Sequence, residues 1–551
     1  MKTLFAGALV IPLLLSACAK QQAPTFDPQR LSEEVRVLSS DEFEGRGPAT
    51  PGEDKTIEYI IDQFKAAGLA PGGDLIDGAR GWTQAVPLGR FEITGPIALE
   101  LGVAGKQQAL TQGEEIAVRA AMNGATEVKV DQVPLVFVGY GVSAPERDWD
   151  DYKGVDLHGK IGIVLVNDPD FETGAGDFGG KAMTYYGRWT YKYEEAARRG
   201  AVGMLVVHET APASYGWATV KNSNTITMFD IVRADPAAEH VAIEGWIQRD
   251  FTVDLFRRAG LDFEALKQQA QTRDFKPVEL PGATLSANYA VASSVITSHN
   301  VVGRIGGAKR PDETVIYSGH WDHLGVGLPD ARGDTIYNGA VDNATGIASL
   351  IELGRAFAHG KRPDRSVVFL AVTAEEKGLL GSEYYAANPL YPLATTVGVL
   401  NIDALSPMGP TRDFSISGGA KLDLLDLLIE TAKPYGMSFT PDTNPEAGLF
   451  FRSDHFPFAK RGVPAVSFDS GEDWVDGGRE AGHAASEAYT KDRYHQPADE
   501  WQSSWPFTGL ALDLEVLYKV GSTLANSDRW PNWGADSEFR ATRDATAAER
   551  R

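Results

Sequence analysis

Acidic and imidazole side chains recur beside apolar runs in the second half of the chain. They stand in Ser318-Gly319-His320-Trp321-Asp322, Asn338-Gly339-Ala340-Val341-Asp342-Asn343, Thr373-Ala374-Glu375-Glu376 and Asn401-Ile402-Asp403, with a fifth candidate in Tyr494-His495-Gln496-Pro497. Imidazoles and carboxylates bind zinc and similar divalent cations, which catalyse hydrolysis when one coordination position stays open to water. The pattern therefore predicts a pair of metal ions.

The placement of the acids suggests a division of roles. Asp342 lies in a glycine-flanked turn before an expected helix, so its carboxylate can bridge two cations. Of the adjacent pair Glu375 and Glu376, one can bind a cation while the other accepts a proton from water. Asp322, two residues after His320, is expected to accept that ring's N–H and fix its tautomer. Single motifs have plainer explanations, such as a helix N-cap at Asp342, but five together favour the metal site.

The elements that must position these groups are short strands and one helix. Residues 315–317, 367–372 and 397–400 are short apolar runs that predict buried strands. Residues 345–357 predict a helix, because Ile347, Leu350, Ile351 and Phe357 fall on one face. Strands that alternate with helices predict a mostly parallel sheet, and such sheets bind ligands at the carboxyl ends of their strands.

These motifs resemble the di-zinc aminopeptidase family, whose relatives include glutamate carboxypeptidase, transferrin receptor and glutaminyl cyclase. The matching residues are His320-Trp321-Asp322, Asp342-Asn343, Glu375-Glu376, Asp403 and Tyr494-His495. The resemblance implies an α/β fold of the zinc exopeptidase type, with a mixed, mostly parallel sheet sandwiched by helices. It also implies two Zn²⁺ per chain, one bound by His320, Asp342 and Asp403 and the other by Asp342, Glu376 and His495, with Glu375 as general base. The run Ala404-Leu405-Ser406 departs from the Met-Ile/Val-Gly often found there.

The function implied by the resemblance is hydrolysis of N-terminal residues from peptides by a metal-bridging water and a glutamate base. Three alternatives stay open. A carboxypeptidase would need an arginine-lined pocket, for which Arg188 and Arg452 are candidates. A glutaminyl cyclase would bind one zinc ion, and a catalytically dead, receptor-like binder would have lost ligands, none of which is missing here.

Two segments are candidates for the substrate pocket. Arg452-Ser453-Asp454-His455 resembles the family segment that lines the substrate cleft. His455 and His483 compete with His495 for the last metal position, and His495 is preferred because its surroundings match the closing motif of the family. The alternatives for His455 are donation to the developing oxyanion or a plain hydrogen bond. The aromatic-basic cluster at 185–189 either contacts substrate through Tyr185 and Arg188 or packs between two parts of the protein. Arg46 is expected to fix a loop.

Composition and the N-terminus indicate export. The net charge is −23 over 551 residues, which argues against binding to nucleic acid phosphates. Lys2 and the apolar run 4–15 predict a signal peptide, and Leu15-Ser16-Ala17-Cys18 resembles a bacterial lipoprotein box. The only cysteine is Cys18, so we expect a lipid anchor there, with the protein at the outer membrane facing the periplasm or cell surface. The oligomeric state is left open.

The expected domain organisation is an interrupted peptidase. Tyr140-Gly141, residues 156–161 and residues 200–203 resemble a protease-associated domain, a smaller β-rich α/β unit. The predicted boundaries are 1–17 for the signal peptide, 18–30 for a tether, 31–119 for the first part of the peptidase domain, 120–275 for the insert, 276–535 for the metal-binding part and 536–551 for a polar tail whose end is expected to fray.

Overall fold

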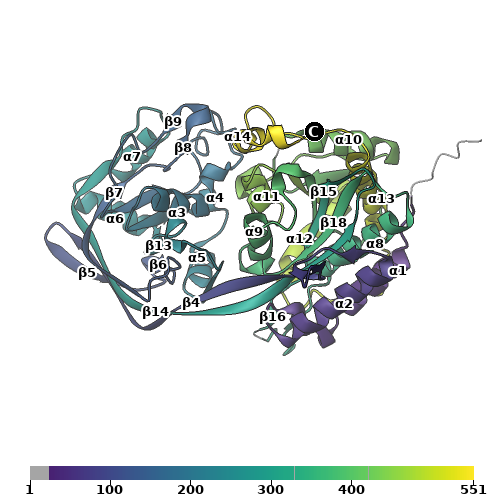
Figure 1. Ribbon diagram of the computed structural model, residues 1–551. Helices are drawn as coiled ribbons and strands as arrows, with labels where there is room; N and C mark the ends of the chain where they lie inside the picture. The colour runs from purple at the N-terminus through teal and green to yellow at the C-terminus, as the bar shows by residue number, and fades with distance from the viewer. Residues whose placement is uncertain (1–23, 328, 420, 551) are drawn as a thin grey trace, which may run out of the picture.

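One mixed sheet runs through both lobes of the protein (Figure 1). The computed structural model describes residues 24–327, 329–419 and 421–550, so the predicted signal peptide and Cys18 lie outside the described residues. In the larger lobe, the parallel strands are, in spatial order, β22 (Ala465–Ser470), β19 (Thr396–Ile402), β15 (Arg310–His320) and β18 (Arg365–Val372). The predicted α/β fold with a mixed, mostly parallel sheet is confirmed.

Successive residues of the central strands face opposite sides of this sheet. Val315 and Tyr317 of β15 are buried in the core that includes α8 and α13, whereas Ile316 packs on the other side with Tyr385 of α9 and Phe458 of α11. The helices of this lobe are α1 (Pro28–Leu38), α2 (Pro51–Ala67), α8 (Thr345–His359), α9 (Leu380–Ala387), α10 (Asp423–Ala432), α11 (Phe456–Lys460), α12 (Gly478–Asp492) and α13 (Thr508–Ala525). Burial of both faces explains why these strands are continuous apolar runs.

The smaller lobe contains a second set of parallel strands. They are β7 (Glu127–Phe137), β10 (Ile161–Leu165), β11 (Gly203–His208) and β13 (Ile243–Gln248), with β6 (Ile116–Val118) antiparallel to β13. Its longer helices are α3 (Trp189–Arg198), α5 (Trp217–Asn224), α6 (Arg249–Arg258) and α7 (Phe263–Ala270). Because β6 precedes residue 120, this lobe takes in chain from before the predicted insert, and the domain boundaries stay a prediction.

Two long antiparallel strands connect the lobes. β4 (Thr83–Val103) and β14 (Val278–Ile305) pair along most of their length, and Figure 1 shows them running beneath both lobes. β14 pairs with β18 in the larger lobe and with β7 in the smaller one. Shorter elements at the edges are β5 (Lys106–Leu110), β12 (Met228–Ile231), β20 (Asp413–Ile416), β21 (Ser438–Phe439) and the pair β16 (Gly325–Val326) and β17 (Ile336–Tyr337).

The C-terminal tail is ordered by a buried arginine. The expected fraying of 541–551 is wrong for its first part, because α14 (Arg540–Ala545) packs against the larger lobe. The Arg543 side chain is 2% exposed, and its Nη1 donates to the Thr396 carbonyl at 3.0 Å. A buried guanidinium with a backbone acceptor holds the helix in place.

Among the described residues, no helix combines the length and apolar character that crossing a membrane requires.

His240 lies between two buried carboxylates of the smaller lobe. Its Nδ1 faces Glu244 Oε1 at 2.8 Å and its Nε2 faces Asp230 Oδ2 at 3.0 Å. Burial opposes a charge on the ring, but the two carboxylates outweigh burial and raise the pKa of His240 to about 9.

We expect His240→Gln to destabilise the protein in a pH-dependent way. The ring has a pKa near 6.5 when unfolded, so the ion pairs contribute fully below about pH 6.5 and are lost as the pH rises through about 9. At 1.36 kcal/mol per pKa unit, the full contribution to the free energy of unfolding is about 3 kcal/mol. Urea unfolding of both proteins near pH 6 and pH 10 measures it, and an equal difference at the two pH values would contradict the assignment.

Candidate metal centre

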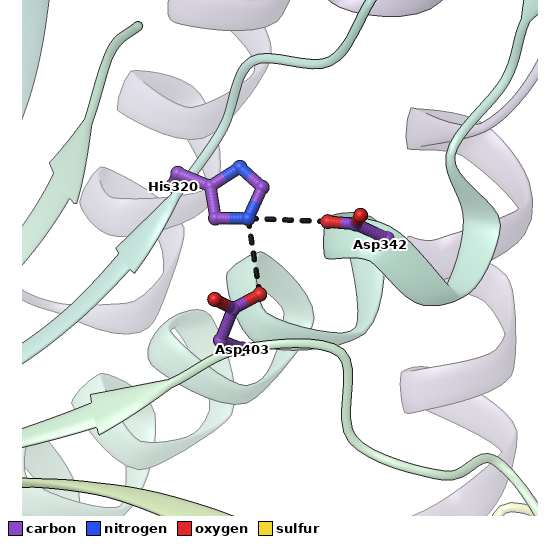
Figure 2. Close-up of side chains that lie close together, drawn as sticks. All are labelled: His320, Asp342 and Asp403. Carbon is purple, nitrogen blue, oxygen red and sulfur yellow. Dashed lines mark hydrogen bonds and ion pairs between the residues drawn. The ribbon is translucent and has the colours of Figure 1, made fainter. Parts of the chain in front are cut away.

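Three side chains meet at the carboxyl ends of the central strands. His320 ends β15, Asp403 follows β19, and Asp342 lies in the turn before α8. His320 Nε2 is 3.2 Å from Asp342 Oδ1 and 3.1 Å from Asp403 Oδ1, as Figure 2 shows. The three residues therefore form one group of donor atoms that converge on a common point.

A second group shares Asp342. His495 Nε2 lies 3.3 Å from Asp342 Oδ2 and 3.2 Å from Glu376 Oε2. The two carboxylate oxygens of Asp342 thus face different histidines, His320 through Oδ1 and His495 through Oδ2. This is the arrangement required of a carboxylate that bridges two cations.

The donor set fits two divalent cations. A tetrahedral site with bonds of 2.0–2.1 Å places its ligand atoms about 3.3–3.4 Å apart, close to the separations found here. Asp342 and Glu376 are buried or nearly so, and no lysine or arginine forms an ion pair with Asp342, Glu376 or Asp403 among the residues that the structure describes. Divalent cations would neutralise this excess of buried negative charge.

Neighbouring groups orient the ligands. Asp403 Oδ2 accepts a hydrogen bond from Ser453 Oγ at 2.6 Å. Asp499 Oδ2 accepts from the backbone amides of Val341 and Asp342 at 3.0 and 3.1 Å, which fixes the bridging loop. Hydrogen bonds of this kind hold ligand oxygens in position before a metal arrives.

Asp322 orients the site differently from the sequence-based expectation. His320 Nδ1 donates to the backbone carbonyl of Asp322 at 3.0 Å, whereas the Asp322 carboxylate lies 3.8 Å away. Asp322 is therefore the accepting residue, but through its backbone carbonyl and not through its carboxylate. The carboxylate instead accepts from the amide of Glu375 at 3.1 Å and that of Glu376 at 3.4 Å, so it holds the two glutamates at the end of β18.

Glu375 has a carboxylate free for proton transfer. Its side chain makes no hydrogen bond or ion pair with any residue in the described ranges, in contrast to Glu376. Burial raises the pKa of Glu375; the charge of His320 opposes this rise, while the nearby carboxylates of Asp403 and Glu376 add to it. A raised pKa and an unengaged carboxylate suit a general base.

Arg46 clamps the loops that carry the ligands. Its guanidinium donates to the carbonyls of Trp321, Asn338 and Gly339 and to that of Leu38, at 2.6–2.9 Å. Burial lowers the pKa of Arg46 to about 10, while the carboxylates of Asp342 and its neighbours oppose that drop, so the group stays charged at neutral pH. The prediction that Arg46 fixes a loop agrees with these contacts.

We expect Arg46→Met to lower the free energy of unfolding by about 3–5 kcal/mol. Four backbone carbonyls lose the guanidinium as a donor, and Asp342 and its neighbouring acids lose a nearby positive charge. Arg46→Lys keeps the charge but cannot reach all four acceptors, so it should recover only part of the loss. Denaturant unfolding measures both variants. The exposed Arg452, which has no such contacts, is the matched control, and an Arg46→Met protein as stable as Arg452→Met would contradict the clamp.

The pocket candidates separate into two kinds. Tyr185 packs between the lobes, since its ring contacts those of Phe451, Phe456 and Phe539, and its hydroxyl donates to Glu194. Arg188 and the exposed Arg452 have no hydrogen bond or ion pair with the rest of the described chain through their side chains, and the Arg188 Nε is buried. Burial lowers the pKa of Arg188 to about 10, and the charge of Arg452 nearby adds to the effect.

Asp454 and His455 are fully buried beside the centre. Asp454 Oδ1 accepts from Ser382 at 2.6 Å, and burial raises its pKa to about 7. Neither ring nitrogen of His455 has a partner within the described residues, and burial lowers its pKa to about 3. His455 is therefore a neutral imidazole at physiological pH.

His323 is a further candidate ligand that the sequence pattern did not indicate. This buried residue follows Asp322, and its Nδ1 lies 2.7 Å from Glu376 Oε1. With Asp342 and Glu376 it forms another group of possible metal ligands. The only sequence signal was a second histidine three residues after His320.

Part of the chain resembles known peptidases in sequence. Residues 300–514, which contain all five predicted ligands, match peptidase family M28. This match covers less than half of the chain. The chain is also similar to a probable zinc metalloprotease of Pyricularia oryzae, at 36% identity over 135 residues that cover 24% of this chain and 26% of that protein.

Two further similarities extend the comparison. Leupeptin-inactivating enzyme 1 of Streptomyces exfoliatus is 28% identical over 38% of this chain and 44% of its own length. The solved aminopeptidase from Aneurinibacillus sp. strain AM-1 aligns over 93% of this chain and 97% of its own, with 19% identity and a TM-score of 0.48. The chain spans about a quarter of the length of the Pyricularia relative and less than half of the Streptomyces one.

Proposed function

We propose that this protein is a two-zinc exopeptidase that removes N-terminal residues from peptides. The observation that carries the proposal is the convergence of His320, Asp403 and Asp342 on one point and of His495 and Glu376 on the other side of Asp342. The match of residues 300–514 to peptidase family M28 supports it, as do relatives named as a zinc metalloprotease and as an aminopeptidase.

Glu375 and His455 have separate roles in the proposed reaction. Two bound zinc ions would supply Lewis acidity at the scissile carbonyl and lower the pKa of a water molecule. Glu375 accepts a proton from the attacking water and passes it to the leaving amine, which its free carboxylate permits. His455, which is neutral and has no hydrogen-bond partner in the described part of the chain, donates an N–H to the developing oxyanion.

Carboxypeptidase activity is the second candidate, and one observation favours it. Arg188 comes from the smaller lobe and Arg452 from the larger, yet their charges act on one another and neither is neutralised by an acid within the described chain. Two unpaired guanidinium groups from different lobes form a suitable place for a substrate carboxylate. This pair would then hold the C-terminus, or an acidic side chain, of the peptide.

A panel of substrates blocked at either end tests the proposal. We expect chromogenic amino-acid amides with a free amine to be cleaved, N-acetylated ones to be resistant, and a chelator to stop hydrolysis until zinc is restored. Cleavage of N-acetylated peptides with a free carboxylate would establish the carboxypeptidase instead. Hydrolysis that a chelator leaves unchanged would contradict a metallopeptidase of either kind.

We also propose that the protein is exported and anchored by a lipid on Cys18, at the outer membrane of a bacterium. Support comes from the predicted signal sequence and from the single cysteine shortly after its apolar run. In a bacterial host, the wild-type protein should partition into detergent and Cys18→Ala should not. A Cys18→Ala protein that still partitions into detergent would contradict the anchor.

A further inference from the structure

His323 is a buried polar residue that the proposed ligand set does not use. It follows β15 in the loop that begins with Trp321, and its side chain is fully shielded from solvent. Nδ1 lies 2.7 Å from Glu376 Oε1, while Nε2 has no partner among the residues that the structure describes. Because an ionised carboxylate can only accept, Nδ1 must carry the proton in this contact.

The contact divides the two oxygens of Glu376 between two histidines. Oε1 faces His323 at 2.7 Å, and Oε2 faces His495 Nε2 at 3.2 Å, on the side shared with Asp342. Oε1 is thus engaged by His323, and Oε2 faces the position between Glu376, His495 and Asp342. A ligating carboxylate held in this way keeps its free oxygen oriented toward a cation.

The surroundings of His323 leave it little freedom to move. Its amide donates to the Arg46 carbonyl at 3.2 Å, and its ring meets that of His495 edge to face at 5.7 Å. Gly339 closes the other side. A Cβ at Gly339, where φ is +55°, would lie 2.7 Å from His323 Cδ2 and 2.2 Å from the Asp342 carbonyl, so only glycine allows this close approach.

We propose that His323 is a positioning residue for one of the two cation sites. By donating to Glu376 Oε1, it sets the affinity of the site formed by Glu376, His495 and Asp342 and leaves the site of His320, Asp342 and Asp403 unchanged. The inference rests on the proposed two-zinc function but concerns one site only. It accounts for a buried histidine that neither binds in the first group nor reaches solvent.

Zinc binding to the purified wild type, His323→Leu and His323→Asn tests the proposal. Zinc per chain is counted by elemental analysis after dialysis, and the two affinities are measured by competition with a colorimetric chelator. We expect two ions in the wild type. His323→Leu should keep one of them at the wild-type affinity and bind the other about 10–100-fold more weakly. His323→Asn carries an amide N–H in place of Nδ1–H and should restore most of the loss.

A matched control separates positioning from general stability. His208 is similarly buried, and its Nε2 lies 2.9 Å from the Tyr215 carbonyl in the smaller lobe. His208→Leu should lower thermal stability without changing either zinc affinity. If His323→Leu fails to fold, His323→Ala takes its place, because a small side chain leaves room for water.

The outcomes are distinct. A wild type that binds no zinc would overturn the proposed function itself. Two ions at unchanged affinity in His323→Leu, or equal weakening of both, would overturn the role of His323 alone. A failure of His323→Asn to restore binding would also overturn it, since the ring nitrogen would then be acting as a ligand and not as a hydrogen-bond donor.

Discussion

Replacing Glu375 with glutamine is expected to leave two zinc ions bound and to reduce kcat by about 10²–10⁴-fold. Within the described residues, the carboxylate makes no hydrogen bond or ion pair with the five proposed metal ligands, so its loss should not empty either site. Glutamine is nearly the same size and shape but cannot accept a proton from water. Steady-state hydrolysis of an amino-acid amide, together with zinc per chain, measures both quantities.

Glu376→Gln is the matched control for this prediction. The two glutamates are adjacent, and both backbone amides donate to Asp322, so the two substitutions lie in the same loop and leave these backbone hydrogen bonds in place. The Glu376 variant should lose zinc from one site, whereas the Glu375 variant should not. Normal turnover in Glu375→Gln would show that another group is the base, and loss of zinc from it would show that Glu375 is a ligand.

The position of the ligands in the fold was predictable because local patterns determine it. The apolar run 367–372 is short, buried on both faces and followed at once by polar residues, so it specifies a central strand and its carboxyl end. β18 spans Arg365–Val372 and delivers Glu375 and Glu376 as expected. His320 and Asp403 follow from the same reasoning on β15 and β19.

The long strands that join the lobes were not predictable in the same way. β14 extends over 28 residues, but its middle alternates buried and exposed positions among alanine, serine and asparagine, and it contains Pro281 and Gly282. Such a sequence has no strong apolar signal and carries turn residues. Its pairing with β4, almost two hundred residues earlier, supplies the stability that the local sequence lacks.

Contacts to backbone carbonyls explain the other points at which the structure differs from what the sequence predicted. Arg46 reaches the Trp321 carbonyl across 275 residues of sequence, and any residue type at 321 would offer the same acceptor. The Asp322 carbonyl likewise replaces the expected carboxylate as the partner of His320. A side chain that binds a carbonyl leaves no complementary residue in the sequence, so only the folded structure identifies the pair.

Asp342→Ala is expected to remove both zinc ions. Each of its oxygens serves a different group, Oδ1 beside His320 and Oδ2 beside His495, so one substitution takes a ligand from both sites. Loss of metal assistance costs several kcal/mol of transition-state stabilisation, and at 1.36 kcal/mol per factor of ten, hydrolysis should fall by about 10³-fold or more. Elemental analysis and the amide assay measure the two losses.

Asp403→Ala provides the comparison that makes the bridge testable. Among the described metal ligands, Asp403 forms an ion pair with His320 alone, so its loss should empty one site and leave the site of Glu376 and His495 able to bind zinc. Asp342→Asn, which keeps the volume and the backbone hydrogen bond to Asp499, distinguishes a lost ligand from a collapsed loop. Asp403→Ala should retain one tightly bound ion. If Asp342→Ala also retained one, the Asp342 carboxylate would belong to a single site and would not bridge two cations.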